Sequence, residues 1–199
     1  MDAVELILVR HAEAENVVTE DDTPADPGLT SRGSAQAEAL AHWLAREPID
    51  RVVSSPSRRA RETAGPTLTR TGLELEIDDR FCEIDPEASH YLSIEEERAR
   101  DHGKFRERIA AYQADPRIIA LSSRVEEGLS EWAARMPGGR VVIFCHGGVV
   151  NVWTRCVLGM TPGFLFEAQN ASSHRYLVSR QGTRGIRSLN ETAYLPYPI

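Results

Sequence analysis

Short apolar runs alternate along the chain with segments whose apolar residues recur at helical spacing. The runs at 5–9, 51–53 and 141–145 each end in a polar or glycine-rich turn, which is typical of a buried strand followed by a loop. Between them, apolar residues share one helical face at Ala37, Leu40, Ala41 and Leu44. Strands that alternate with helices predict an α/β fold: a three-layer α/β/α, doubly wound, mostly parallel sheet.

Residues that favour helix ends predict where two of the helices begin. Ser55 is expected to be the N-cap of a helix whose first residue is Pro56. The spacing of Ser123-Arg124-Val125-Glu126 fits a capping box, and Pro137-Gly138-Gly139 ends that second helix. Near the end of the chain the strand pattern returns at 174–179 and 185–189.

The segment 85–121 interrupts this alternation. It is rich in charge and has no strand signal, so it predicts one or two helices inserted as a cap over the active site. The length of 199 residues suits a single domain, 1–199, that includes this insertion. His90, Tyr91 and Phe105 either shape a specificity pocket or form the core of the insertion, and the sequence favours neither.

Charge and composition narrow the classes of partner. The formal net charge of −7 disfavours nucleic acid and anionic membrane surfaces, so an anion site has to be built locally. No apolar run approaches the roughly 18 to 20 residues of a membrane span, and the acidic start lacks the features of a secretory signal, so we expect a cytoplasmic protein. The 3 cysteines show no close pair, and the 6 histidines show no ligand pair, so neither a metal nor another cofactor is expected.

Arginine and histidine side chains stand where the apolar runs end. Arg10 and His11 follow the first run, Arg59 lies in the first turn of the helix after the second, and His146 precedes Gly147-Gly148 after the third. If these strand ends adjoin, two guanidinium groups and two imidazoles converge on one pocket. Arginine forks and helix N-termini suit phosphate oxygens, and an imidazole in line with phosphorus can attack it. The pattern therefore predicts a phosphoryl-transfer site.

Four segments, in this order, resemble the histidine phosphatase superfamily, the phosphoglycerate mutase-like proteins (branch 1). They are Arg10-His11-Ala12-Glu13, which is similar to the family's Arg-His-Gly-Glu signature, Leu29-Thr30-x-x-Gly33, Ser54-Ser55-Pro56-Ser57-Arg58-Arg59-Ala60, and His146-Gly147-Gly148-Val149. The segments 170–172 and 189–193 look like the family's closing segments, so the resemblance covers nearly the whole chain.

The resemblance implies a role for individual residues. His11 would be the nucleophile that becomes phosphohistidine, Arg10 and Arg59 would bind the phosphoryl oxygens, and His146 would stabilise the transferring group. Glu83, which follows Phe81-Cys82, would donate a proton to the leaving oxygen.

The chain departs from the family pattern at several positions. Ala12 replaces the usual glycine, which would matter if that residue needed a positive φ. Asn16 falls one position before the family's phosphate-contacting asparagine, and it is a candidate substrate-binding residue together with Gly147. After Glu83 the family's Gly-x-Trp-x-Gly continuation is missing, so an unusual substrate-facing rim is expected.

Other phosphatase chemistries do not fit the sequence. A cysteine phosphatase needs an arginine six positions after its cysteine, but Asn151 stands there after Cys145. An aspartyl phosphotransferase needs Asp-x-Asp, whereas Asp78-Asp79-Arg80 has arginine in the third place.

The expected function is that of a metal-independent phosphomonoesterase of the histidine acid phosphatase type, acting on a small phosphorylated substrate. A cofactor-dependent mutase is the alternative, but the segment 83–87 does not reproduce the Glu-Arg-His-Tyr-Gly of such mutases. A non-catalytic phosphate-binding module is the second alternative. Such relatives have usually lost the residue equivalent to His11 or to Arg59, but both are present here. The identity of the ester and the oligomeric state stay open at this stage.

Overall fold

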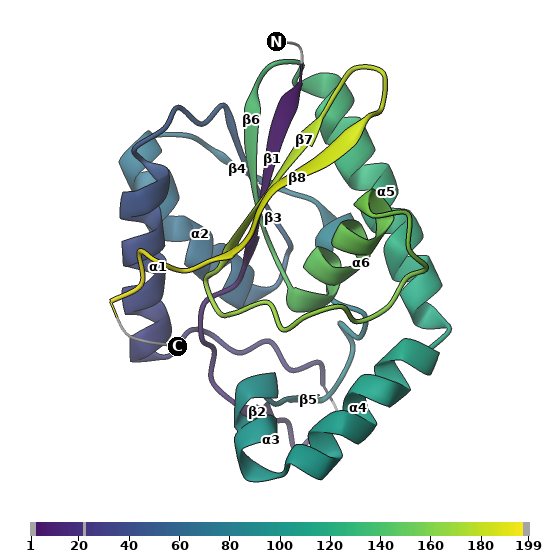
Figure 1. Cartoon of the computed structure of the whole chain (residues 1–199). Helices are drawn as coiled ribbons and strands as arrows, with labels where there is room; N and C mark the ends of the chain where they lie inside the picture. The colour runs from purple at the N-terminus through teal and green to yellow at the C-terminus, as the bar shows by residue number, and fades with distance from the viewer. Residues whose placement is uncertain (1–2, 22, 197–199) are drawn as a thin grey trace.

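A sheet of six strands forms the centre of the computed structural model, which describes residues 3–21 and 23–196 (Figure 1). Its strands lie in the order β4-β3-β6-β1-β7-β8. They are β1 (Val4–Arg10), β3 (Arg51–Ser54), β4 (Leu75–Ile77), β6 (Arg140–Cys145), β7 (Ser173–Val178) and β8 (Arg184–Glu191). The first four in this spatial order are parallel, and β7 pairs antiparallel with both β1 and β8. The β7–β8 hairpin confirms the strand pattern near the end of the chain.

Helices cover both faces of the sheet (Figure 1). The helices α1 (Ser31–Leu44) and α2 (Arg58–Thr71) lie on one face, and α5 (Arg117–Arg135) and α6 (Gly147–Val157) lie on the other. A short 3₁₀ helix, η1 (Asp79–Phe81), follows β4. The expected three-layer α/β/α architecture with a mostly parallel sheet is therefore confirmed.

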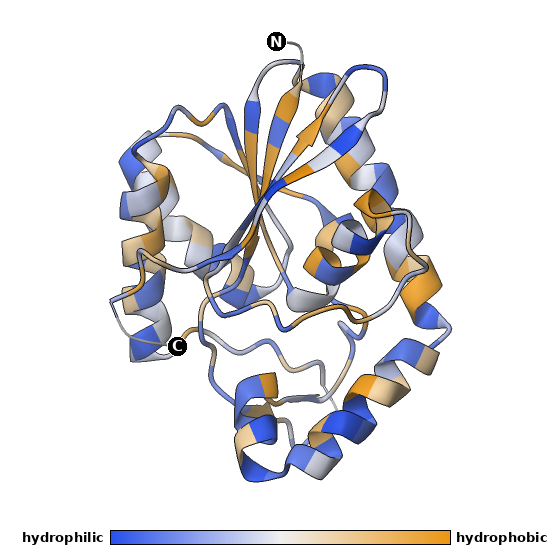
Figure 2. Cartoon of the chain, viewed as in Figure 1, coloured by the Kyte–Doolittle hydropathy of each residue, from blue (hydrophilic) through white to orange (hydrophobic). Residues whose placement is uncertain are grey.

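Strand β1 carries the core on both of its faces, since all 7 of its residues are buried. Leu6 and Leu8 belong to the apolar cluster under α5 and α6, while Ile7 and Val9 belong to the cluster under α1 and α2. Figure 2 shows the same arrangement, with apolar colour on the strands and polar colour on the outer helix surfaces. Full burial of each such side chain stabilises the fold by about 1.5–3 kcal/mol, and the packing fixes where β1 ends.

A second, smaller group of elements lies beyond the end of the sheet at which β1, β3 and β6 finish (Figure 1). It consists of β2 (Val17–Val18), β5 (His90–Tyr91), α3 (Ile94–Arg100) and α4 (His102–Ala114), and we call it the cap. Strands β2 and β5 pair antiparallel, so the segment 85–121 contains a strand that its sequence does not indicate. A strand of 2 residues is too short to produce an alternating pattern.

The predicted start of α2 is wrong by a few residues. The helix begins at Arg58, with Ser57 in the N-cap position, instead of at Pro56. Ser55 is buried, and its hydroxyl lies 2.9 Å from Nε2 of His146. The hydroxyl of Ser55 is therefore engaged in a tertiary contact with His146, and Ser55 does not occupy the N-cap position that the sequence predicts for it.

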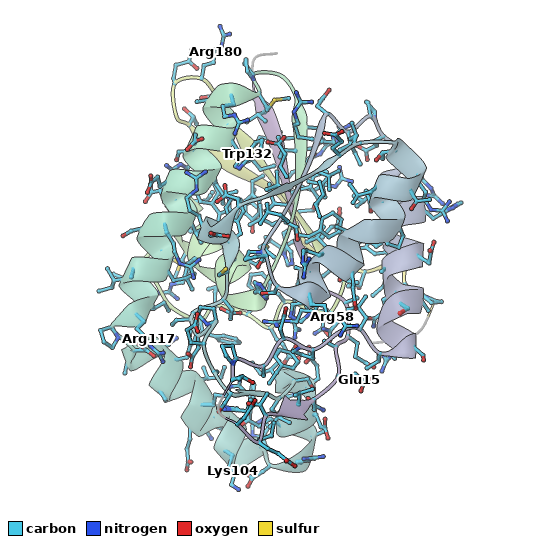
Figure 3. The ribbon with its side chains drawn as sticks, turned by 180° about the vertical axis from the view of Figure 1, so that it is seen from behind. Glu15, Arg58, Lys104, Arg117, Trp132 and Arg180 are labelled. Carbon is cyan, nitrogen blue, oxygen red and sulfur yellow. The ribbon has the colours of Figure 1, made fainter. Side chains whose placement is uncertain are left out.

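The predicted start of α5 is also wrong. The helix begins at Arg117, where the backbone N–H donates to the Asp115 carboxylate at 2.8 Å. Ser123 therefore lies inside the helix, and its hydroxyl donates to the carbonyl of Ile119 at 3.0 Å. Residues 117–121, which the sequence assigns to the cap, belong to this helix, and Leu121 is part of the core. In Figure 3, Arg117 marks the start of α5, Trp132 lies in its last turn, and Lys104 marks the cap.

Among the residues that the structure describes, no helix has the length and apolar character needed to cross a membrane.

Candidate active site

The ends of β1, β3 and β6 bring the predicted site residues together. The backbone N–H of His11 donates to the carbonyl of Cys145 at 2.9 Å, and that of Ser55 donates to the carbonyl of Phe144 at 2.9 Å. These bonds extend the parallel ladder by one residue past each strand. As a result, the ring centroids of His11 and His146 lie 5.3 Å apart.

His11 is held as a neutral imidazole with one free nitrogen. Its Nδ1 lies 2.8 Å from the carbonyl oxygen of Ala12, and because a carbonyl only accepts, Nδ1 carries the proton and Nε2 keeps its lone pair. Burial lowers the pKa of His11 well below its ordinary value, and the nearby charges of Arg59 and Arg10 lower this pKa further. An unprotonated Nε2 is what a nucleophilic histidine requires.

His146 lies behind His11 and is fully buried. Its Nδ1 is 3.4 Å from Nη2 of Arg59, which only donates, so the proton is on Nε2 and is donated to Ser55 at 2.9 Å. Burial lowers the pKa of His146 well below its ordinary value, as does the charge of Arg59. His146 does not line the cavity described below; it contacts the arginine and the histidine that do.

The two arginines face the same space with different partners. Arg10 donates to both carboxylate oxygens of Glu95 and, through Nη1, to the carbonyl of Ala168 at 2.5 Å. Arg59 lies with its guanidinium carbon 4.7 Å from the centre of the Tyr91 ring, and its Nε is buried with no hydrogen-bond partner. A buried donor without a partner is costly, so Nε of Arg59 favours an anion at this point.

Glu83 reaches the start of α6. Its Oε2 accepts a hydrogen bond from the backbone N–H of Gly148 at 3.2 Å. A Cβ at position 148 would lie 2.1 Å from Oε1 of Glu83 and 2.8 Å from the hydroxyl of Tyr112, so only glycine permits this approach. That hydroxyl is buried without a partner, and burial together with the charge of Glu83 raises the pKa of Tyr112.

These groups line a cavity of about 730 Å³ between the sheet end and the cap. Five of the residues that the sequence assigned to the site line this cavity, namely Arg10, His11, Arg59, Glu83 and Gly147. The sequence did not single out several other residues of the wall, namely Glu167, Tyr112, Phe164, Phe166 and Ala168. They come from the cap and from the loop after α6, and their spacing along the chain carries no signal of a shared site.

The residues that the sequence left undecided separate clearly. Tyr91 and His90 line the cavity, and the ring centroid of Tyr91 lies 6.0 Å from that of His11. Phe105 does not line it; its ring lies 6.0 Å from that of His102 within α4. Ala12 needs no positive φ, since among the described residues only Ala171 and Asn190 adopt one without being glycine.

Asn16 does not reach the cavity. Its side-chain oxygen accepts a hydrogen bond from the backbone N–H of Ser93 at 2.8 Å, and its amide donates to Glu96. Both partners belong to the start of α3. The residue therefore ties the loop after β1 to the cap instead of facing the other predicted site residues.

The described residues, 3–21 and 23–196, contain no cluster of three histidine, cysteine or carboxylate side chains that could hold a metal ion.

The sequence profile of the histidine phosphatase superfamily (branch 1) matches residues 6–192. The chain belongs to this superfamily. Phosphoserine phosphatase 1 of Hydrogenobacter thermophilus is 31% identical over 200 residues, which cover 96% of this chain and 94% of the relative. The glucosyl-3-phosphoglycerate phosphatase of Mycolicibacterium vanbaalenii is 27% identical over 167 residues, 78% of this chain and 74% of the relative.

A solved structure shares the fold of this chain. The solved structure of a mycobacterial hydrolase (hydrolase 2) matches with a TM-score of 0.75 at 24% identity, over 97% of this chain and 93% of that one. Family and relatives together establish a phosphatase of the histidine phosphatase type. They do not favour the mutase or the non-catalytic alternative.

Proposed function

We propose that this phosphatase is a metal-independent phosphomonoesterase that works through a phosphohistidine on His11. One observation carries the proposal: His11 is a buried, neutral imidazole whose Nδ1 is bonded to the Ala12 carbonyl and whose Nε2 is free beside the cavity. The unpartnered Nε of Arg59 and the amides at the start of α6 supply donors for the phosphoryl oxygens.

In the first step, Nε2 of His11 attacks phosphorus and the P–O bond to the alcohol breaks. The departing oxygen takes a proton from the Glu83 carboxyl, so the alcohol leaves neutral and Glu83 becomes a carboxylate. The Nδ1–H of His11 keeps its bond to Ala12, which stabilises the positive charge that develops on the ring. Arg10 and Arg59 bind the equatorial oxygens, and His146 holds Arg59 through its Nδ1.

In the second step, a water molecule attacks the phosphorus of the phosphohistidine. The Glu83 carboxylate takes a proton from this water, the P–N bond breaks, and inorganic phosphate leaves. Nε2 of His11 regains its lone pair, and Glu83 is again protonated for the next cycle.

We propose that the enzyme is of the acid type and acts on a small phosphorylated metabolite. A carboxyl group holds its proton more fully at acidic pH, which favours the first step. His11 remains unprotonated there because burial and Arg59 lower its pKa well below the ordinary value. Phosphoserine and glucosyl-3-phosphoglycerate, named for two relatives, head the panel of esters to be tried.

The test is phosphate release from p-nitrophenyl phosphate with excess EDTA between about pH 5 and 8, for the wild type and for His11→Ala. We expect metal-independent turnover in the wild type and none above background in the variant. His42→Ala is the matched control, because His42 is exposed near the end of α1, and it should retain wild-type turnover. Quenching during turnover in alkaline detergent, in which the P–N bond of a phosphohistidine survives, should trap a phosphoryl group on the wild-type chain and none on His11→Ala.

Turnover that EDTA abolishes would overturn the metal-independent mechanism. Turnover that survives in His11→Ala would overturn the proposal of a phosphohistidine intermediate on His11. An enzyme that transfers phosphate only when given a phosphorylated primer would be a mutase instead.

A further inference from the structure

Both arginines assigned to the phosphoryl group have a carboxylate partner from another segment. Arg10 donates through Nη1 and Nη2 to both oxygens of Glu95 on α3, the second at 3.2 Å. Nη1 of Arg59 lies 3.8 Å from the carboxylate of Asp26. The first pair is a bidentate fork on a buried arginine, whereas the second is a single, longer contact to an exposed aspartate.

The Glu95 carboxylate binds Arg10 in the way that a phosphoryl group would. A guanidinium presents five N–H groups, and the bonds to Glu95 and to the Ala168 carbonyl use three of them, all on the outer nitrogens. Carboxylate and phosphate oxygens compete for this same planar fork. A phosphoryl group that takes the outer edge of Arg10 has to displace Glu95, and one that takes the remaining donors has to lie beside its negative charge.

A second carboxyl group increases this repulsion. Glu167 lies in the same wall, is paired with Arg98 of α3 and has one oxygen buried without a partner. Burial raises the pKa of Glu167, and the charge of Glu95 raises it further. The space next to Arg10 therefore already disfavours added negative charge while Glu95 is in place.

Helix α3, which carries Glu95, is only half-buried: its first residue, Ile94, lies in the cavity wall, and its last residues are exposed. None of its residues is fully buried. Its start is tied to Asn16 through the backbone of Ser93, and its end is tied to Glu167 through Arg98. A helix with no fully buried side chain moves at a lower free-energy cost than a core helix, so exchange of Glu95 for another anion is feasible in this fold.

We propose that Glu95 is an intramolecular competitor for Arg10, which the phosphoryl group of the substrate or inorganic phosphate displaces on binding. The inference rests on the proposed function in one respect, namely that Arg10 binds phosphoryl oxygens. Glu95 then determines the affinity of the site for phosphate: it weakens binding of substrate and product alike, and it favours release of inorganic phosphate after each turnover. The alternative role, in which Glu95 only orients Arg10, has the opposite effect on affinity.

The experiment measures the dissociation constant of inorganic phosphate by titration calorimetry, and its inhibition constant against p-nitrophenyl phosphate. Glu95→Gln keeps the size of the side chain and removes its charge. We expect both constants to fall about tenfold, because the variant removes the repulsion between the Glu95 carboxylate and the bound phosphate. The KM of the substrate should fall with them. Glu96→Gln is the matched control: it removes the same charge from the next residue of α3, whose carboxylate contacts Arg100 and Asn16 instead of Arg10.

An unchanged or higher dissociation constant in Glu95→Gln would overturn the inference, since a residue that only orients Arg10 strengthens binding. An equal fall in Glu96→Gln would also overturn it, because the effect would then belong to the general charge of the cap. Calorimetry separates this result from the proposed function. If Glu95→Gln binds phosphate more tightly but the wild type has no phosphatase activity, the inference stands and the proposed function is wrong. If the wild type is a His11-dependent phosphatase but Glu95→Gln binds phosphate as the wild type does, the proposed function stands and the inference is wrong.

Discussion

The carboxylate of Glu83 fits against the backbone of Gly148, whose N–H donates to Oε2 at 3.2 Å. No side chain has room there, because a Cβ on residue 148 would lie 2.1 Å from Oε1. The conformation of the proposed proton donor therefore depends on a residue 65 positions later in the chain.

Gly148→Ala should displace Glu83 and lower kcat. Loss of a well-placed general acid costs about a hundredfold in rate, so we expect a fall of that size in kcat measured with an alkyl ester such as phosphoserine, whose oxygen leaves poorly without a proton, and little change in the circular dichroism spectrum. Gly185→Ala is the control, since nothing outside the adjacent residues lies within 4 Å of a Cβ at that exposed position of β8; it should keep full activity. Unchanged kcat in Gly148→Ala would show that Glu83 does not supply the proton.

Arg59→Lys should lower kcat/KM by about a hundredfold, because lysine cannot reproduce the planar fork or the stacking on Tyr91. The neighbouring Arg58→Lys is its matched control: Arg58 is exposed at the start of α2 and pairs with Glu62 (Figure 3). Steady-state kinetics on both variants check the expectation. Equal losses in the two would indicate a general perturbation of the helix start, and the specific geometry of Arg59 would then not be responsible.

The pH dependence of kcat/KM should show no loss of activity as the pH falls from 8 to about 5. A histidine whose folded pKa is lowered binds its proton only below that lowered value, so the nucleophile stays free through the ordinary range of histidine titration, near 6.5. The measurement is a profile of kcat/KM, which reports the free enzyme, together with the NMR titration of the ring protons of His11. A midpoint of the His11 titration near 6.5 or above would contradict the expectation.

Acid should destabilise the fold partly through His174. This buried ring accepts a hydrogen bond from the backbone N–H of Asn190 at 3.1 Å and lies 2.9 Å from the hydroxyl of Ser172, and burial lowers its pKa from 6.5 to about 3. The unfolded state therefore binds the proton between pH 6.5 and 3 while the folded state does not, and stability falls as the pH falls through this window. At pH 5 the loss amounts to about 2 kcal/mol.

His174→Gln removes this titration, so its free energy of unfolding should depend less on pH between 7 and 5 than that of the wild type. Urea unfolding at the two pH values measures the difference. The slope with pH is the relevant quantity, because the substitution also changes the stability at pH 7. Identical slopes in the two proteins would show that His174 is not the group responsible.

The part of the site that lies on the sheet could be predicted because strand ends are local features. An apolar run that stops at Arg10-His11 fixes where these side chains emerge, and parallel pairing brings them to the residues that follow the other runs. The family resemblance then added Glu83, which lines the cavity as expected of a proton donor. For Arg10, His11 and His146, which stand at strand ends, secondary structure alone links the position in the sequence to the position in space.

The part of the site that lies on the cap could not be predicted in the same way. Glu95 has the same charge and nearly the same sequence surroundings as Glu96 and Glu97, and only the tertiary structure selects it as the partner of Arg10, 85 residues away. The predicted start of α2 was wrong for a related reason, since the hydroxyl of Ser55 is engaged by His146. Side-chain pairing between distant segments leaves no periodic trace in a sequence.

The position of β1 in the sheet has a consequence for synthesis of the protein on the ribosome. This strand is made well before its two neighbours, β6 and β7, and the backbone of His11 is also bonded to that of Ala171. The strand that precedes the proposed nucleophile, His11, therefore has no sheet partners until β6 and β7 have been translated. Phosphatase activity should appear late and all at once, so nascent chains truncated before residue 170 should be inactive however well their N-terminal helices have formed.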